Sequence, residues 1–138
     1  MNYDDVNVGD EIAPRDFAVQ RINLVMYCGA SGDFNPIHWN ERFAKMVGLP
    51  DVIAHGMFTM AEAARVVTDW AGDPGAVESY KVRFSKPVVV PDDNAGATLT
   101  VGGRVEEKLD GNRVVVVLEA KSADDTVLQG ARATVRLA

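Results

Sequence analysis

The sequence has a single cysteine, Cys28, among its 138 residues. One thiol excludes a disulfide within the chain, and one sulfur cannot build a cysteine-rich structural zinc site. The sequence also lacks a long apolar run, because the longest one, residues 114–118, falls far short of the roughly 20 residues that span a bilayer. Residues 1–12 contain neither the basic stretch nor the apolar core of a secretory leader. We therefore expect a cytoplasmic protein with no membrane segment.

Positive charge is also scarce in this chain. Lysine and arginine number 14 against 20 aspartates and glutamates, which gives a net charge of -6 and an isoelectric point near 4.8. The protein as a whole therefore repels a phosphate backbone, and binding to nucleic acid would need a local basic patch. The sequence contains no internal repeat and no linker. We expect no nucleic-acid partner and a single domain that spans residues 1–138.

The first half of the chain shows helical periodicity after a short extended piece at residues 16–19. We expect two short amphipathic helices at residues 21–28 and 40–47, the first of which ends at Gly29. The side chains expected on their inner faces are Ile22, Val25, Met26, Phe43, Met46 and Val47. Residues 57–71 are apolar around most of a helical circumference, which predicts a long helix buried in the core.

From residue 77 onward, apolar and polar residues alternate, which predicts strands with one buried face. The alternation covers residues 80–84, 98–101 and 127–137. Residues 114–118 instead form a continuous and mostly β-branched run, which is typical of a central strand covered on both faces.

Turn signals separate these predicted strands. Asp110-Gly111 is a strong hairpin signal, and Asp124-Asp125 is a weaker one. Gly102-Gly103 inside a strand pattern indicates a bulge or bend that would help a sheet to curl. Four strands in antiparallel meander order, preceded by one long apolar helix, predict an α+β domain. We expect a curved antiparallel sheet wrapped around one long buried helix.

The densest cluster of polar and reactive side chains lies at residues 31–38. Pro36 cannot lie inside a helix, so Asp33 and His38 project from a loop that Gly32 and Pro36 bend. Such a loop can aim both side chains at one point. An ionised carboxylate close to an imidazole forms an acid/base pair that can hold one water, accept its proton and deliver another.

Residues 54–57 lie where a loop meets the N-terminus of the predicted buried helix. The first backbone N–H groups of a helix have no internal partner, and the helix dipole favours negative charge in front of them. The Gly56 amide could therefore bind a thioester carbonyl oxygen as charge develops on it. The missing side chain of glycine would let that oxygen approach.

Two sequence stretches carry a family resemblance. Residues 27–38, which read YCGASGDFNPIH, and residues 54–57, which read AHGM, together resemble the motif of the (R)-specific enoyl-CoA hydratases, which are MaoC-like hydratases of hot-dog fold. The likeness extends to residues 8–10 and 82–87, so it covers most of the chain.

Within that family, the stretch around His38 and residues 70–77 look most like the catalytic subunits of mycobacterial (3R)-hydroxyacyl-ACP dehydratases. The resemblance implies that Asp33 and His38 form a catalytic dyad, that Asn35 supports it, and that the Gly56 amide polarises the thioester carbonyl. The implied substrate is an acyl-CoA or acyl-ACP, with no cofactor and no metal. The resemblance also implies dimers whose sheets join edge to edge, as a homodimer or as a heterodimer with a related hot-dog subunit.

Plain structural roles compete with these assignments. Asp33 could form a turn, Asn35 could cap a helix, and His38 could be a hydrogen-bonded structural histidine. Cys28 is expected to be a buried thiol rather than a nucleophile. His55 is expected to anchor its own loop rather than to take part in catalysis.

Two groups of residues allow more than one interpretation. One group is a mixed nitrogen and oxygen set that could bind a metal, although no paired histidine spacing supports this. Its members are Asp33, His38, Glu41 and His55. The second group is basic and could be a solvated strand face or a binding site for the carrier of the substrate, since an acidic protein needs local positive charge for that purpose. Its members are Lys81, Arg83 and Lys86.

We therefore expect a hydro-lyase that interconverts (3R)-hydroxyacyl and trans-2-enoyl thioesters in fatty acid metabolism. A hot-dog acyl thioesterase is an alternative, because the same groups could aim water at the thioester carbon. A non-catalytic acyl-thioester-binding subunit is another alternative. The sequence leaves open the acyl chain length, the carrier, and whether Asp33 or His38 acts as the base.

Overall fold

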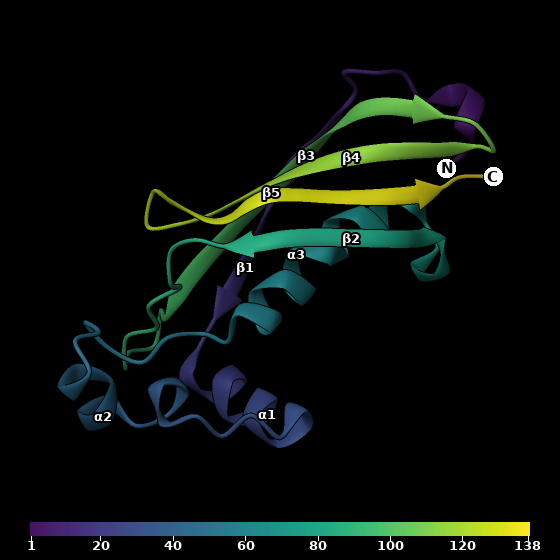
Figure 1. Cartoon of the computed structure of the whole chain (residues 1–138). Coiled ribbons are helices and arrows are strands. Elements are labelled where there is room, and N and C mark those ends of the chain that lie inside the picture. Colours follow the sequence, from purple (N-terminus) through teal and green to yellow (C-terminus); the bar gives the residue numbers. More distant parts are fainter.

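The computed structural model describes all 138 residues, and it consists of a five-stranded sheet, three α-helices and three short 3₁₀ turns. The larger elements are β1 (Glu11–Val19), α1 (Arg21–Ser31), α2 (Glu41–Met46), α3 (Gly56–Ala71), β2 (Val77–Phe84), β3 (Ala97–Leu109), β4 (Arg113–Ser122) and β5 (Asp125–Arg136). The turns are η1 (Tyr3–Asp5), η2 (Pro36–His38) and η3 (Pro74–Ala76). Figure 1 shows the sheet curving over α3, with α1 and α2 beyond one end of the sheet. None of the helices has the length and apolar character that crossing a bilayer requires.

All strand pairs are antiparallel, and the strand order is β1-β3-β4-β5-β2. Both predicted hairpin turns are present. One lies at residues 110–112, and the other lies at Ala123-Asp124, one residue earlier than predicted, where both residues have positive φ. These short turns make β3, β4 and β5 an antiparallel meander of three strands, whereas the sequence predicted one of four strands. The meander does not include β2, which pairs with β5 rather than with β3. Residues 85–96 connect β2 to β3, and a connection of that length lets the chain cross to another part of the sheet.

The strand β1 is a full edge strand of nine residues, whereas the sequence predicted only an extended piece at residues 16–19. Its alternation of buried and exposed residues is broken because Ala13 and Pro14 lie opposite the single Gly102 of β3. This is a β-bulge, which puts two residues of one strand opposite one of its neighbour. A bulge is therefore present at the predicted place, but its extra residue belongs to β1 and not to β3.

The core lies between α3 and the face of the sheet that covers this helix. It is one cluster of 28 buried apolar residues, to which α3 contributes Ala63, Val66, Val67 and Ala71. The helix is therefore buried as predicted along the side that the sheet covers. Its opposite side is more open than predicted, since Met57 is 56% exposed.

The buried faces of α1 and α2 differ from the predicted ones. The helix α1 continues through Gly29 and ends where Gly32 adopts a φ of 74°. It buries Leu24 and Cys28, and α2 buries Ala44. The residues that were predicted to face inward but are exposed are Ile22, Val25, Met26, Met46 and Val47. Each helix carries apolar residues on more than one stripe, and only one stripe has a packing partner within the chain.

One cluster of charged side chains ties the α1–α2 lobe (residues 21–46) to the rest of the protein. Arg21 donates from Nε to the Val90 carbonyl at 2.6 Å, and its Nη2 lies 2.6 Å from Asp51 Oδ1 and 3.4 Å from Glu41 Oε2. Glu41 also accepts a hydrogen bond from Lys45 at 2.5 Å, which holds the pKa of the Glu41 carboxyl below its ordinary value. The cluster therefore connects the start of α1, the start of α2 and the strand-like segment around Val90.

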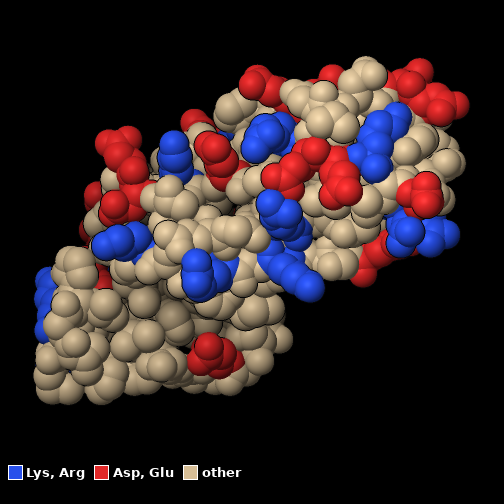
Figure 2. Space-filling view, turned by 45° about the horizontal axis from the view of Figure 1, so that its top comes forward, with Lys and Arg blue, Asp and Glu red and all other residues tan.

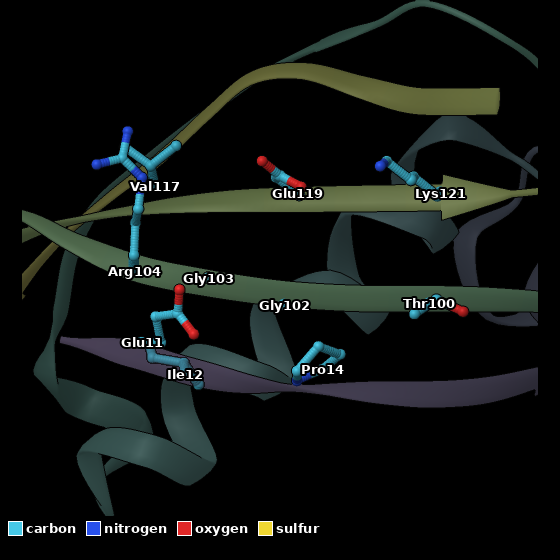
Figure 3. A pocket seen from close by; sticks show the side chains of 10 residues that line it. All are labelled: Glu11, Ile12, Pro14, Thr100, Gly102, Gly103, Arg104, Val117, Glu119 and Lys121. Atoms are coloured by element: carbon cyan, nitrogen blue, oxygen red, sulfur yellow. The ribbon is translucent and has the colours of Figure 1, made fainter. Parts of the chain in front are cut away.

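The outer face of the sheet is partly uncovered, and the prediction that β4 is covered on both faces is wrong. Its residues alternate, so Val115 and Val117 stay half-buried while their neighbours in β4 are buried. A hollow of about 340 Å³ opens on this face between β1, β3 and β4, where Gly102 has no side chain to fill it (Figure 3). The charged residues around the hollow are Glu11, Arg104, Glu119 and Lys121.

Candidate active site

Asp33 lies in a short loop between α1 and η2, and local hydrogen bonds fix this loop. The Asp33 N–H donates to Ser31 Oγ at 3.1 Å, and Asp33 Oδ1 accepts the N–H of Asn35 at 3.1 Å. Asn35 Oδ1 accepts the N–H of Ile37 at 3.2 Å and so caps η2. The structure thus contains the turn and the cap that the sequence allowed. Asn35 shapes the loop, and the second oxygen of Asp33 remains free to face the site.

His38 ends η2 with its side chain only 8% exposed, and its two ring nitrogens have different surroundings. Nδ1 lies 2.7 Å from the Ile53 carbonyl oxygen, so this nitrogen carries a proton and donates it. Burial lowers the pKa of His38 below its ordinary value of 6.5, against the opposing effect of the Ile53 hydrogen bond. At neutral pH the ring is therefore uncharged, and Nε2 presents a lone pair.

Asp33 and His38 face each other across a gap. Asp33 Oδ2 lies 4.0 Å from His38 Nε2, and the Asp33 side chain is 54% exposed. The gap is too long for a direct hydrogen bond, and it suits one water that bonds to both atoms. The two predicted dyad residues therefore face each other as two hydrogen-bond acceptors, and the Asp33 side of the gap is open to solvent.

Gly56 is the first residue of α3, so no carbonyl of this helix accepts its N–H. It lines a pocket of about 230 Å³ together with His38, Phe84 and Lys86. The ring of Phe84 covers Gly56 so closely that a Cβ added to Gly56 would lie 2.6 Å from Phe84 Cδ2. The structure thus brings the predicted amide donor and the predicted imidazole into one pocket.

Of the three predicted basic residues, only Lys86 reaches this pocket. Lys81 and Arg83 are exposed on β2, and Arg83 Nη2 donates to Gln129 Oε1 at 3.3 Å. In Figure 2, charged side chains gather over the sheet, while the α1–α2 lobe presents a mostly uncharged surface. Positive charge at the pocket itself therefore comes from Lys86.

The structure also brings in residues that the sequence did not assign to the site. The His55 ring is 2% exposed and stacks on the His38 ring with the centroids 3.7 Å apart. The Tyr27 ring packs on His55 at 4.7 Å, and Phe84 covers Gly56. These residues occur in the stretches that carried the family resemblance. No spacing of residues along the sequence predicts that two histidines from different elements will stack. Cys28 is buried as predicted, and burial raises the pKa of its thiol.

The candidate metal ligands are only partly assembled. Asp33, His38 and His55 each place one ligand atom within 4.8 Å of the others, whereas Glu41 is held elsewhere by Arg21 and Lys45. His38 Nδ1 and His55 Nε2 already lie within hydrogen-bond distance of backbone carbonyls. The group would have to contract before it could bind a metal, because ligand bonds near 2.1 Å put ligand atoms about 3.4 Å apart.

Comparison with known sequences identifies relatives of the whole fold. Residues 6–125 match the model of the MaoC like domain family. The chain is 47% identical over 81 residues to 3-hydroxyacyl-thioester dehydratase X of Mycobacterium tuberculosis, an alignment that covers 56% of this chain and 28% of that protein. It is 31% identical over 107 residues to the (R)-specific enoyl-CoA hydratase of Rhodospirillum rubrum, which covers 77% of this chain and 73% of the hydratase. The chain thus spans less than a third of the first of these relatives and nearly three quarters of the second.

Solved structures agree with this assignment. A MaoC-like dehydratase superposes with a TM-score of 0.96 at 43% identity, over 99% of this chain and 42% of that one. A chain of the ChsH1-ChsH2 complex from Mycobacterium tuberculosis shares the fold with a TM-score of 0.83 at 22% identity, over 96% of this chain and 98% of that one. The observed α+β arrangement is the hot-dog fold that the sequence predicted. The chain belongs to the MaoC like domain family.

Proposed function

We propose that this protein is a hydro-lyase that interconverts (3R)-hydroxyacyl and trans-2-enoyl thioesters of CoA or acyl carrier protein. One observation carries the proposal: Asp33 Oδ2 and His38 Nε2 face each other across 4.0 Å, and His38 shares a pocket with the Gly56 amide at the start of α3. Adding water to an α,β-unsaturated thioester has two requirements. A water must lie between the two side chains, and the carbonyl oxygen of the substrate must lie at the Gly56 amide.

The tautomer of His38 assigns roles to the pair in the hydration direction. Its Nδ1–H is engaged by the Ile53 carbonyl, so the Nε2 lone pair accepts one proton of the water while Asp33 Oδ2 accepts a hydrogen bond from the other. The water oxygen bonds to C3, and the electrons of the C2=C3 bond shift toward the thioester carbonyl. The Gly56 N–H stabilises the resulting enolate oxygen, and the protonated dyad returns one proton to C2.

The relatives support this choice of reaction. The hydratase from Rhodospirillum rubrum and the dehydratase from Mycobacterium tuberculosis carry the two opposite directions of the same interconversion in their names. Water must enter the site for hydration and leave it for dehydration. The exposed Asp33 carboxylate beside the uncharged His38 imidazole fits both directions, because it keeps the place of the water open to solvent. The single buried thiol of Cys28 is compatible with the reducing cytoplasm, where we place the activity.

We further propose that the chain works as a dimer, with itself or with a related hot-dog subunit. In this chain, β1 and β2 are sheet edges with unpaired backbone groups, and such edges are commonly covered by another chain. The α1–α2 lobe adds exposed apolar side chains, among them Met26, Met46 and Val47. The ChsH1-ChsH2 complex contains the same fold in a two-subunit assembly. Residues 1–138 form one domain in this proposal, since their buried apolar residues make one cluster.

The carrier of the substrate is expected to approach over β2. Lys86 lines the pocket, and Lys81 and Arg83 are exposed on the strand that leads to it. On a protein with net charge -6, these cations supply the local attraction that a phosphate-bearing CoA or carrier needs.

A product analysis with a short trans-2-enoyl-CoA tests the proposal and separates it from its alternatives. The conjugated double bond should disappear, and a 3-hydroxyacyl-CoA of R configuration should form without release of free thiol. Free CoA that appears in step with substrate loss would show a thioesterase. Binding without turnover, also in the presence of a related hot-dog subunit, would show a non-catalytic subunit.

A further inference from the structure

His55 is in contact with both residues of the proposed dyad. Its Nε2 lies 3.0 Å from the backbone carbonyl oxygen of Asp33, so the ring N–H donates to the loop that carries the carboxylate. Its ring face lies against His38, with the centroids 3.7 Å apart and the planes 21° from parallel. One side chain thus contacts both halves of a pair whose members do not touch each other.

Two residues of α1 also pack against His55. The Tyr27 ring packs on it at 4.7 Å with a 58° tilt, and Cys28 Sγ lies 3.7 Å from Nε2. His55 is also the residue immediately before Gly56, at the cap position of α3. The ring therefore joins α1, the Asp33 loop, η2 and the amide of α3 at one point.

The polar atoms of His55 indicate a role other than packing. Its Nδ1 is buried and has no hydrogen-bond partner. An unpartnered buried polar atom destabilises the folded state, and a phenyl ring of the same shape would avoid that cost. The side chain thus contributes something that an apolar ring would not, and its shortest polar contact is the hydrogen bond to the Asp33 carbonyl.

We propose that His55 is a positioning residue for the dyad: its N–H sets the place of Asp33, and its ring face sets the plane of His38. The catalytic part of this proposal rests on the proposed hydratase function. We expect the 4.0 Å gap that accommodates the water to depend on both contacts, since His55 touches the Asp33 loop through its N–H and His38 of η2 through its ring face. Displacement of a reacting group by about 1 Å can cost up to 100-fold in rate.

The surroundings of His38 define a second readout. The titratable groups that face His38 are Asp33 and His55, with Lys86 in the same pocket. His55 contributes to the lowering of the pKa of His38, after the larger effect of burial. A loss of the stack should therefore raise the pKa of His38.

Two substitutions separate the two contacts. His55→Phe keeps a ring against His38 and removes the donor to Asp33, whereas His55→Gln keeps a donor and removes the ring. We expect kcat for enoyl-CoA hydration to fall about 10- to 100-fold in both variants with little change in KM. In His55→Gln, the titration of His38 followed by NMR should move to higher pH, and the acid limb of the pH–rate profile should move with it. Val67→Ala, in the buried part of α3, is the control for a loss of stability alone and should leave kcat unchanged.

The NMR measurement keeps this proposal distinct from the proposed function. If the wild-type protein does not hydrate enoyl-CoA but the His38 titration still shifts in His55→Gln, the hydratase assignment fails and the positioning role stands. If kcat and the His38 titration are both unchanged in the two variants, His55 only packs, and the positioning role is refuted. The same conclusion follows if Val67→Ala lowers kcat as much as they do.

Discussion

The substitution Gly56→Ala tests how the pocket is built, because the structure gives its steric cost directly. An added Cβ would lie 2.6, 2.7 and 2.9 Å from three ring carbons of Phe84, whereas carbon atoms in contact normally lie about 3.5–4.0 Å apart. The ring would have to withdraw by about 1 Å. Phe84 is 50% exposed, so it can swing toward solvent, and we expect a loss of about 1 kcal/mol in the free energy of unfolding, the lower end of overpacking costs.

The effect on activity should be much larger than this effect on stability. The new methyl group would enter the pocket that Gly56 lines with His38 and Phe84, and we expect it to displace the substrate carbonyl from the Gly56 amide. Loss of one oxyanion donor typically costs about 10²- to 10³-fold in kcat. We therefore expect a kcat reduction of that size for short enoyl-CoA, measured by loss of the conjugated double bond, together with a small shift in chemical denaturation.

Gly29→Ala is the matched control, since Gly29 lies inside α1 with no atom within 4 Å of an added Cβ. It should leave kcat unchanged and stabilise the protein by about 0.5–1 kcal/mol, because alanine loses less backbone entropy on folding. In a Phe84→Ala background, adding Gly56→Ala should no longer destabilise but should still lower kcat. Full activity in Gly56→Ala, or recovery of activity in the double variant, would refute the assignment of the Gly56 amide as the oxyanion donor.

Three further predictions follow from the site. Asp33→Asn and His38→Ala should each lower kcat at least about 100-fold, the usual loss for a general acid or base, without a change in the far-UV circular dichroism; near-normal rates in either variant would remove that residue from the dyad. Charge reversal of Lys81 and Lys86 together should raise KM much more at low salt than at high salt, and an unchanged salt dependence would make them an ordinary solvated surface. Because the pKa of His38 is lowered in the folded protein, the unfolded chain binds its proton more readily below pH 6.5, so the free energy of unfolding should fall as the pH drops through 6.5. Denaturation of His38→Gln should lack this part of the slope, and an equal slope in both proteins would contradict the burial argument.

Local chemistry made much of the fold predictable from the sequence. The turns at Asp110-Gly111 and near Asp124 define β3, β4 and β5, and the apolar residues 57–71 mark α3, because hairpin geometry and helical periodicity act over a few residues. The position of β2 beside β5 was not predictable in this way. It depends on where the long connection at residues 85–96 leads, which no local pattern specifies.

The inner faces of α1 and α2 were not predictable for a related reason. In α1, Ile22, Val25 and Met26 form an apolar stripe as regular as the one that contains Leu24 and Cys28, and only the tertiary structure decides which stripe has a neighbour. A stripe that is apolar but exposed in the single chain is what a partner subunit would cover, so the pattern alone does not separate core from interface.

In the candidate site, too, the local features were predictable and the long-range contacts were not. Asp33 and His38 are five residues apart on one loop, so their meeting follows from the bend at Pro36. Lys81 and Arg83 alternate with apolar residues on β2, which indicated only that they lie on the exposed face of this strand. Lys86 reaches the pocket because it lies beyond the end of β2. The stack of His55 on His38 required the packing of η2 against the start of α3, which is a long-range property.

The Arg21 cluster has a consequence for the way the protein loses activity. The α1–α2 lobe lies beyond the end of the sheet, and Arg21 is its charged connection to Val90 and Asp51. Elements with few links to the core open locally at lower free energy than the whole domain. Moderate denaturant should therefore detach the lobe first, exposing its backbone amides to hydrogen exchange while β3, β4 and β5 stay protected. Since Asp33 and His38 follow α1 and Gly56 belongs to α3, catalysis should fail at a lower denaturant concentration than the sheet does.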